Sequence, residues 1–407
     1  MSSTIEKNKK RVVVTGLGIV SSIGIGWKNF WNNLLNGRSR VNQILCFDTL
    51  PYERHVGCEI LDFKPENYLS NRMIKKFGRS SQMAIIASKL ALEDANLELK
   101  NVKVGLCMGT TMGESQNIEN IISSLITTKE NNNAKLLTLL YPSNIINTSI
   151  AREFRLDNLN LTFATACSAG NYAIGTAFDL IHSGKQDYML AGGVDSFSRI
   201  AFTGFNRLFA VAPGICQPFD KNRKGILLGE GAGMLVLESF DNARKRGATI
   251  YAEILGYGLT CDSKHMTIPT AENLAKTISK SLRESGVEVN QVDHINAHGT
   301  GTRENDKVEC RAFSMVFGER LKEIPITSIK SVLGHTMGAA SAFETIASCL
   351  SLRYGIIPPT INFFDRAGEC NINCVANYPL NKKINIVLNN SQAFGGNNAA
   401  LVLSKLN

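Results

Sequence analysis

The sequence lacks any apolar run long enough to cross a membrane, and its basic start, MSSTIEKNKKR, leads through only three valines into a glycine turn. A transmembrane helix needs about 20 apolar residues, and a secretory signal needs a longer apolar segment than this start offers. The ten cysteines are scattered singly, with no C-x-x-C pair, in a chain too long to need disulfide staples. We therefore expect a soluble protein of the reducing cytoplasm, with no membrane partner.

Charged residues are also sparse, at 19% of the 407 positions against 44% hydrophobic residues. This composition is typical of a globular chain and argues against a disordered tail. The net charge of +9 would suit an acidic partner, but no basic block interleaved with aromatic residues occurs, so we expect no nucleic acid partner. The length suffices for two domain-sized cores.

Strands and helices alternate through the whole sequence. Buried, apolar strands are expected at RVVV, KVGLCMG, DYMLAGGVD and GAGMLVLES, and an amphipathic helix over residues 80–97. The pattern of residues 159–184 indicates a strand, a tight turn and a helix that ends at a glycine. This alternation predicts an α/β fold with at least one mostly parallel sheet.

The order of elements recurs after a boundary near residues 246–250. Residues 250–302 give a strand, a helix and a second strand, and residues 324–352 repeat the strand, turn and helix of the first half. This is a repeat of secondary-structure elements and not of sequence, because the residues themselves do not recur. We therefore predict two halves, residues 1–248 and residues 249–407.

Cys167 lies in FATACSAGN, at the junction of an expected strand and helix. A helix N-terminus favours the thiolate over the thiol, because the helix dipole stabilises negative charge there. Small residues on both sides leave room for a substrate. Most cysteines in such a chain are inert core residues, but this turn singles out Cys167 as the candidate nucleophile.

Two of the six histidines lie in glycine-rich turns at strand ends. His298 belongs to NAHGTGT, and His335 to SIKSVLGHTMGAA, where Lys330 lies just before it. A single histidine of this kind is more often a satisfied hydrogen-bonding group than a catalyst. Together with Cys167 at a third strand end, the two histidines predict a converging site.

Two other kinds of site deserve weighing. His294 and His298 have the i, i+4 spacing of a zinc pair, but that spacing suits a helix and VDHINAH indicates a strand. No third ligand cluster is nearby, so we expect no metal. GLGIVS near Gly16 lacks the third glycine and the following acidic residue of a dinucleotide site.

Five motifs follow one another along the chain: TACSAG, PFDKNRKG with LGEGAG, NAHGTGT, SIKSVLGH and FGGNN. With these motifs the sequence resembles the β-ketoacyl-acyl-carrier-protein synthases, the elongating condensing enzymes of type II fatty acid and type II polyketide synthesis. The resemblance covers essentially the whole chain. It implies a thiolase-like fold of two pseudo-symmetric α/β halves in alternating α and β layers. It also implies a dimer and no cofactor, with substrates carried on the phosphopantetheine of an acyl carrier protein.

The resemblance also implies roles for individual residues. Cys167 accepts the acyl chain as a thioester, and the backbone N–H groups of Cys167 and Phe394 form the oxyanion hole. His298 and His335 bind the malonyl thioester carbonyl and stabilise its enolate as neutral imidazoles. The remaining implied roles are support by Lys330, Glu344 and Asp306, a gate at Phe394, pantetheine contacts at Thr300 and Thr302, acyl-chain contacts at Met112 and Gln392, and carrier docking by Arg72, Lys75, Lys76 and Arg223.

The chain departs from the fatty acid pattern at Gln392, because those enzymes usually carry an aromatic residue two positions before the gate phenylalanine. HGTGTRENDKVE and SIKSVLGH look closer to polyketide enzymes, and FGGNN is similar to synthases that build polyenes. We therefore predict decarboxylative Claisen condensation with malonyl-acyl-carrier protein in a type II polyketide or polyene pathway.

Three alternatives stay open at this point. One is a housekeeping fatty acid elongation synthase. Another is a non-catalytic, chain-length-factor-like subunit, although such proteins lack the nucleophile that Cys167 supplies here. The third is a thiolase, which would need a second catalytic cysteine near the C-terminal glycine loop, where NSQAFGGNN has none. The dimer partner is either a second copy or a related chain-length-factor-like subunit.

Overall fold

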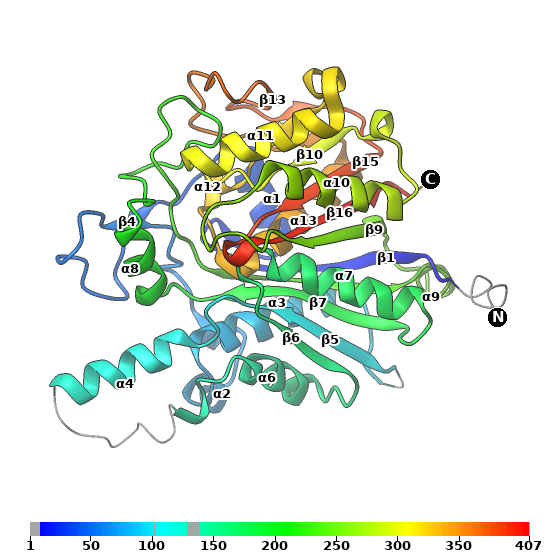
Figure 1. Ribbon diagram of the computed structural model, residues 1–407. Helices are drawn as coiled ribbons and strands as arrows, with labels where there is room; N and C mark the ends of the chain where they lie inside the picture. Colours follow the sequence, from blue (N-terminus) through cyan, green and yellow to red (C-terminus); the bar gives the residue numbers. More distant parts are fainter. Residues whose placement is uncertain (1–8, 101, 128–137, 407) are drawn as a thin grey trace.

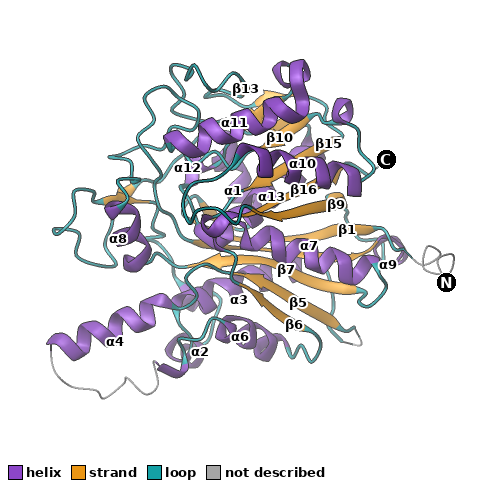
Figure 2. Cartoon of the chain, viewed as in Figure 1, coloured by secondary structure: helices purple, strands orange, loops and turns teal. Residues whose placement is uncertain are grey.

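The computed structural model describes residues 9–100, 102–127 and 138–406, and its centre is one 12-stranded sheet (Figure 1, Figure 2). The strand order is β13-β11-β10-β15-β16-β9-β1-β8-β7-β5-β6, with β2 paired to β1. The strands are β1 (Val12–Ser21), β2 (Gly24–Ile25), β5 (Val104–Gly109), β6 (Asn160–Phe163), β7 (Tyr188–Asp195), β8 (Gly231–Ser239), β9 (Ala252–Cys261), β10 (His294–Asn296), β11 (Pro325–Thr327), β13 (Asn373–Cys374), β15 (Ile386–Ser391) and β16 (Asn397–Ser404). Two small pairs lie apart, β3 (Asn42–Gln43) with β4 (Val56–Gly57) and β12 (Ile356–Ile357) with β14 (Leu380–Asn381).

The sheet repeats one arrangement on either side of its centre, where β1 and β9 pair antiparallel. On one side β8 lies antiparallel between β1 and β7, and β5 and β6 continue parallel to β7. On the other side β16 lies antiparallel between β9 and β15, and β10 and β11 continue parallel to β15. The predicted pair of pseudo-symmetric α/β halves is therefore confirmed.

Helices form layers on and between the two half-sheets. The central helices α7 and α13 contact strands of both halves, whereas α3 packs on β1 and β8 of the first half and α10 on β9 and β16 of the second. In Figure 1, α10 and α11 cover one outer side of the molecule, and α3 and α6 lie on the opposite side. The helices are α1 (Trp27–Leu35), α2 (Asn71–Lys76), α3 (Arg79–Asp94), α4 (Ser115–Thr127), α6 (Asn144–Phe154), α7 (Ala169–His182), α8 (Arg199–Arg207), α9 (Phe240–Lys245), α10 (Ala271–Glu284), α11 (Arg303–Phe317), α12 (Lys330–Leu333) and α13 (Ala340–Tyr354).

The central strand β1 shows why its sequence is almost continuously apolar. All ten of its residues are buried, because helices cover both faces of the sheet at this point. A Cβ atom built on Gly18 would lie 1.8 Å from the carbonyl oxygen of Ala87, and one on Gly16 would lie 2.2 Å from that of Ala91. The two glycines therefore let α3 approach the strand closely, which is the structural use of the GLG sequence.

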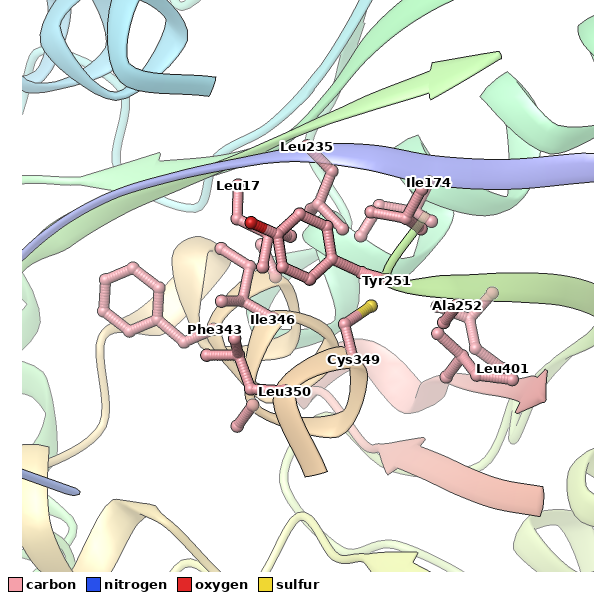
Figure 3. Packing of buried hydrophobic residues seen from close by; sticks show 14 of the residues in the cluster. Leu17, Ile174, Leu235, Tyr251, Ala252, Phe343, Ile346, Cys349, Leu350 and Leu401 are labelled. Atoms are coloured by element: carbon pink, nitrogen blue, oxygen red, sulfur yellow. The ribbon is translucent and has the colours of Figure 1, made fainter. Parts of the chain in front are cut away.

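The largest hydrophobic cluster joins the two halves (Figure 3). Phe343, Ile346 and Leu350 of α13 meet Leu17 of β1 and Leu401 of β16 within it. Every residue of α13 from Ala340 to Leu352 is buried, and Glu344 is the one charged residue in that stretch. The central helices therefore fix the position of each half relative to the other. No helix of the described residues is long and apolar enough to span a bilayer.

Candidate active site

Cys167 lies in a one-turn helix, η3 (Ala166–Ser168), between the end of β6 and the start of α7. Ala166 has a φ of 48°, a left-handed conformation that an ordinary L residue adopts only at a cost. Strain of this kind persists where the surrounding structure holds it in place, and it concentrates at functional sites. The turn places Cys167, which is 5% exposed, at the head of a helix packed between the two halves.

The electrostatic environment of Cys167 differs from the sequence-based expectation. Burial raises the pKa of this thiol to about 12, and Asp195 adds to the rise. Lys330 and the backbone N–H groups of Cys167 and Phe394 lower the pKa only in part. The prediction that the helix N-terminus favours the thiolate is therefore wrong for the free protein, because desolvation of a buried charge outweighs the helix dipole.

His298 follows β10 in a loop that buried polar groups hold in place. Glu309 of α11 accepts hydrogen bonds from the backbone N–H groups of His298 at 2.7 Å and Gly299 at 2.8 Å. Lys330 donates to the carbonyl oxygen of His298 at 2.7 Å, and its Nζ lies 3.3 Å from Nδ1 of the same ring. Because an ammonium group can only donate, Nδ1 of His298 is an acceptor and the ring proton lies on Nε2.

His335 lies between α12 and the one-turn helix η6 (Met337–Ala339), in the counterpart of the nucleophile turn. Met337 has a φ of 53°, close to that of Ala166, and its backbone N–H donates to Nδ1 of His335 at 3.2 Å. The proton of this ring therefore also lies on Nε2. The rings of His298 and His335 meet edge to face, with their centroids 5.4 Å apart.

Both histidines are neutral at pH 7. Burial lowers the pKa of each ring well below 6.5, and the ammonium group of Lys330 lowers it further. His335 adds to the lowering at His298. The structure thus brings together a buried thiol and two neutral imidazoles, each with one Nε2–H to donate.

Lys330 and Glu344 form a buried ion pair behind the histidines. Burial raises the pKa of Glu344 to about 7, and Lys330 opposes that rise. Removing either partner would leave an unpaired charge in the core, which is strongly destabilising. The pair therefore fixes the ammonium group that contacts His298.

Two buried carboxylates that the sequence did not single out also organise the site. One is Glu309, described above. The other is Asp195 at the end of β7, which accepts from the backbone N–H groups of Thr111 at 2.8 Å, Met112 at 2.7 Å and Gly338 at 2.7 Å. It thereby ties the loop after β5 to η6. The only signal for Asp195 in the sequence is its position as an acidic residue at the end of the apolar run DYMLAGGVD.

A cavity of about 670 Å³ opens beside these groups. Cys167, His298 and His335 lie in its wall, and the ion pair of Lys330 and Glu344 does not. The side-chain oxygens of Thr300 and Thr302, which are 3.0 Å apart, come from the loop after His298. Of the residues predicted to contact substrate, the cavity wall contains Thr300, Thr302, Gln392 and Phe394.

Phe394 begins the one-turn helix η7 (Phe394–Gly396) and is 38% exposed. Its ring packs on Phe205 of α8, with the two centroids 5.3 Å apart. Met112 is not part of the cavity wall, and instead packs against an aromatic cluster that includes Phe197 and Phe202. Its assignment to the acyl channel stays a prediction.

Arg223 is buried, with 1% of its surface exposed, and its guanidinium group is held inside the protein. It donates to Glu369 at 2.7 Å and to the carbonyl oxygen of Arg303 at 3.1 Å, and it lies 3.6 Å from the carboxylate of Asp306. The prediction that Arg223 docks a carrier protein is therefore wrong, because its charge is already paired. Asp306 in turn accepts from the backbone N–H of Gly301, which supports the loop carrying the two threonines.

A positive patch lies on α2 and α6. Arg72 and Lys75 are exposed and Lys76 is half-buried. Partial desolvation, followed by the charges of Arg152 and Arg72, lowers the pKa of Lys76. Arg152 belongs to α6 and was missed in the sequence, because only the fold brings it beside α2. None of these four residues lines the cavity.

His294, weighed earlier as a metal ligand, lies on β10 as expected. It is fully buried, and neither of its ring nitrogens has a hydrogen-bond partner in the described part of the chain. Within that part, no group of three histidine, cysteine, aspartate or glutamate side chains could hold a metal ion.

Two family models match most of the chain, up to residue 364. The N-terminal domain of beta-ketoacyl synthase matches residues 9–243, and the C-terminal domain matches residues 251–364. The 3-oxoacyl-(acyl-carrier-protein) synthase 2 of Coxiella burnetii is 37% identical over 413 residues, covering 98% of this chain and 99% of that protein. Its namesake in Staphylococcus aureus (strain N315) is 33% identical over 407 residues, covering 97% and 98%.

Solved structures share the fold over the same length. The ishigamide ketosynthase/chain length factor matches with a TM-score of 0.95 at 41% identity, over 98% of this chain and 100% of that chain. The AntDE:AntF complex, a type II polyketide synthase acyl-carrier protein with its ketosynthase bound to the hexaketide, matches with a TM-score of 0.90 at 30% identity and the same coverage. The chain therefore belongs to the β-ketoacyl-acyl-carrier-protein synthases, acyltransferases with a thiolase-like fold.

Proposed function

We propose that this chain condenses an acyl group held on Cys167 with a malonyl group on an acyl carrier protein, with loss of CO₂, in a type II polyketide or polyene pathway. The observation that carries this proposal is the placement of a buried thiol and two neutral imidazoles in one cavity wall. Two Nε2–H groups can donate to a single oxygen without protonating it. An enolate oxygen needs that kind of support.

In the first step the acyl chain moves from its carrier to the protein. The sulfur of Cys167 attacks the thioester carbonyl, and the pantetheine sulfur leaves. The thiol proton ends on the departing sulfur, so that the buried site carries no charge before or after transfer. The N–H groups of Cys167 and Phe394 point at the Cys167 sulfur and are placed to donate to the oxyanion formed on the adjacent carbon.

In the second step the malonyl thioester loses its carboxylate as CO₂ and becomes an enolate. The N–H groups of His298 and His335 donate to its oxygen. The enolate carbon then attacks the thioester carbonyl on Cys167 and forms the new carbon–carbon bond. The product is a 3-oxoacyl carrier protein, and the released thiolate takes a proton from solvent.

Two observations support a polyketide or polyene pathway: the similarity to the ishigamide ketosynthase/chain length factor and the presence of Gln392. The ishigamide ketosynthase/chain length factor shares 41% of its sequence with this chain, against 37% for the Coxiella burnetii synthase. Gln392 places an amide beside the gate, where a fully saturated chain offers nothing for it to bind. A housekeeping fatty acid synthase is the second candidate. It is supported by the 37% and 33% identity of this chain to the 3-oxoacyl-(acyl-carrier-protein) synthases 2 of Coxiella burnetii and Staphylococcus aureus.

The proposed partners are an acyl carrier protein and a second subunit of the same fold. The patch of Arg72, Lys75, Lys76 and Arg152 suits the acidic surface expected of an acyl carrier protein. Among the described residues, no strand pairs with the outer side of the edge strand β6, and such an edge is available for pairing with another subunit. That subunit is a second copy or a chain-length-factor-like relative.

The test is to supply purified protein, alone and with such a relative, with acyl-loaded and malonyl-loaded carrier protein. Intact-protein mass spectrometry should show an acyl group on Cys167 and then a 3-oxoacyl carrier protein. Cys167→Ala should lose condensation while the histidines still decarboxylate malonyl carrier. Cys107→Ala, a matched change at another buried cysteine, should keep the acyl group and the product.

Three outcomes would count against the proposal. Acylation of Cys167→Ala at another thiol would remove the nucleophile assignment. Wild-type protein that forms no 3-oxoacyl product with any chain or partner would contradict the reaction. A preference of about tenfold or more for saturated chains over both 2-enoyl and 3-oxo chains of equal length would favour the fatty acid pathway.

A further inference from the structure

Gln392 carries a buried amide at the wall of the cavity. It is 3% exposed, and neither its Nε2 nor its Oε1 has a hydrogen-bond partner among the residues that the structure describes. It follows β15 directly and lines the same cavity as Cys167, His298 and Phe394. Its amide is therefore available to whatever enters this cavity.

An unpaired amide is unusual at such a position. Most buried polar side chains in proteins have a partner, because losing water without gaining a hydrogen bond is unfavourable. The wall of this cavity also contains apolar side chains, with Phe205, Ile268 and Ala393 among them. An apolar residue would fit this wall without the penalty. The amide therefore favours ligands that place a polar atom next to it.

The location of the amide limits which part of a ligand it can contact. Two peptide units separate Gln392 from Phe394, which is at most about 7 Å of backbone. The N–H of Phe394 in turn points at the sulfur of Cys167. The amide therefore lies within reach of the first few carbons of a chain bound to that sulfur.

We propose that Gln392 is a specificity-determining residue that recognises an oxygen on the third carbon of the acyl chain held by Cys167. The inference rests on the proposed function and deepens it, because the selected chain keeps its β-oxygen. A 3-oxo chain accepts a hydrogen bond from Nε2, and its enol form or a 3-hydroxy chain also donates to Oε1. Saturated and 2-enoyl chains offer neither.

The first experiment uses the wild-type protein alone. Carrier proteins loaded with saturated, 2-enoyl, 3-hydroxy and 3-oxo chains of equal length are compared by kcat/KM for acyl transfer to Cys167, followed by intact-protein mass. The 3-oxo and 3-hydroxy chains should exceed the saturated chain by about tenfold, as expected when a buried amide gains its missing partner. Equal values would overturn the inference, and so would a 2-enoyl chain that is preferred to both oxygenated chains.

The second experiment removes the amide. Q392L, a substitution of similar size, should lower kcat/KM about tenfold for the oxygenated chains and leave it level or raise it for the saturated chain. The circular dichroism spectrum and melting temperature of the variant are the controls for folding. Q392M, which keeps the unbranched shape, takes its place if Q392L does not fold. A variant with wild-type selectivity would overturn the inference.

The same measurements separate this inference from its alternatives. If Gln392 contacts the pantetheine arm that all substrates share, Q392L lowers kcat/KM by one factor for every chain, and the inference is wrong. If the wild type accepts all four chains on Cys167 with equal kcat/KM, only the inference fails. If it condenses none of them, either alone or with a chain-length-factor-like partner, the proposed function itself fails.

Discussion

The protonation state of two rings decides what this site can do. His298 and His335 each use Nδ1 as an acceptor, from Lys330 and from the backbone of Met337. If Nδ1 of either ring gained a proton, its N–H would face another donor: the ammonium group of Lys330 at His298, or the backbone N–H of Met337 at His335. Burial already holds the pKa of both rings well below 6.5. The neutral forms therefore persist as the pH falls, and we expect these rings to keep condensation level from about pH 8 to about pH 6.

The pH profile of kcat for condensation, measured with saturating carrier substrates, checks this expectation. Activity should decline only well below about pH 6, where the rings begin to take up protons. A bell-shaped profile with an acid limb near the ordinary histidine pKa would contradict it. It would mean that one ring is exposed or acts as a proton carrier in the rate-limiting step, or that protonation of Glu344, whose pKa burial raises to about 7, weakens its ion pair with Lys330.

Loss of one imidazole should separate the two half-reactions. His335→Ala removes one donor from the enolate but leaves Cys167 and its two backbone N–H groups in place. Removing one such donor raises the barrier by about 3 kcal/mol, or about two powers of ten in rate. Decarboxylation and condensation should slow by that factor while acyl-enzyme still forms, as followed by intact-protein mass. A folded variant that cannot be acylated would assign His335 to thiol activation instead.

The sequence predicts the three reacting side chains, and the family resemblance implies the supporting roles of Lys330, Glu344 and Asp306, but Asp195 and Glu309 were missed. Cys167, His298 and His335 lie in local motifs of small residues, so the turns that carry them can be predicted from the sequence. Asp195 and Glu309 act through backbone N–H groups contributed by other elements, and no local motif marks such contacts. The pKa of Cys167 was missed for the same reason: a helix N-terminus is visible in the sequence, but complete burial between the two halves is not.

Elements show a similar division. The strand, turn and helix around Cys167, and their repeat around His335, were predicted because hydrophobic period and turn residues change together there. Arg223 lies in PFDKNRKG, which looks like a charged surface loop, yet the fold buries it against Glu369 and Asp306. Arg152 was missed because it joins the patch on α2 from another helix.

The positive patch makes a prediction for the element that carries it. Reversing Arg72 and Lys76 to Glu should raise KM for carrier-bound substrate, most strongly at low salt, because exposed charges act over about 10 Å at ordinary ionic strength. Lys276→Glu with Lys280→Glu is the matched control, since this pair has the same spacing and exposure on α10. Equal effects of the two reversals would leave α2 without a docking role.

Strand β10 carries a buried base whose effect on stability depends on pH. Burial lowers the pKa of His294 to about 3, whereas the unfolded chain titrates near 6.5. Because the folded pKa is depressed, stability is complete above about pH 6.5 and falls as the unfolded state takes up a proton at lower pH. From pH 7 to pH 5 the free energy of unfolding should fall by about 2 kcal/mol less in His294→Leu than in the wild type. The free energies of unfolding are measured by urea titration. An equal fall for the wild type and His294→Leu between pH 7 and pH 5 would contradict the prediction.

The whole molecule is held together by its central helices. Strands β1 and β9 join the half-sheets through three residue pairs, whereas α7 and α13 contact both halves along their length. The nucleophile comes from one half and both histidines from the other. The active site therefore exists only while the halves are packed together, and the fold and the site should be lost in one transition.

Two matched truncations test whether the halves unfold together. Ile346 of α13 lies in the shared cluster, and Ile278 of the outer helix α10 lies in a separate cluster whose buried members, apart from Phe219, all come from the second half. Each change to Ala should lower the free energy of unfolding by about 2–5 kcal/mol. Both tryptophans, Trp27 and Trp31, belong to α1 of the first half and stack on Tyr354 of α13, so their fluorescence reports the packing of the two halves. If the halves unfold as one unit, Ile278→Ala must still lower the denaturant midpoint of tryptophan fluorescence, and the midpoint should coincide with those of circular dichroism and activity. A fluorescence midpoint that Ile346→Ala lowers and Ile278→Ala leaves unchanged would mean that the outer region around α10 can unfold while the two halves stay packed together.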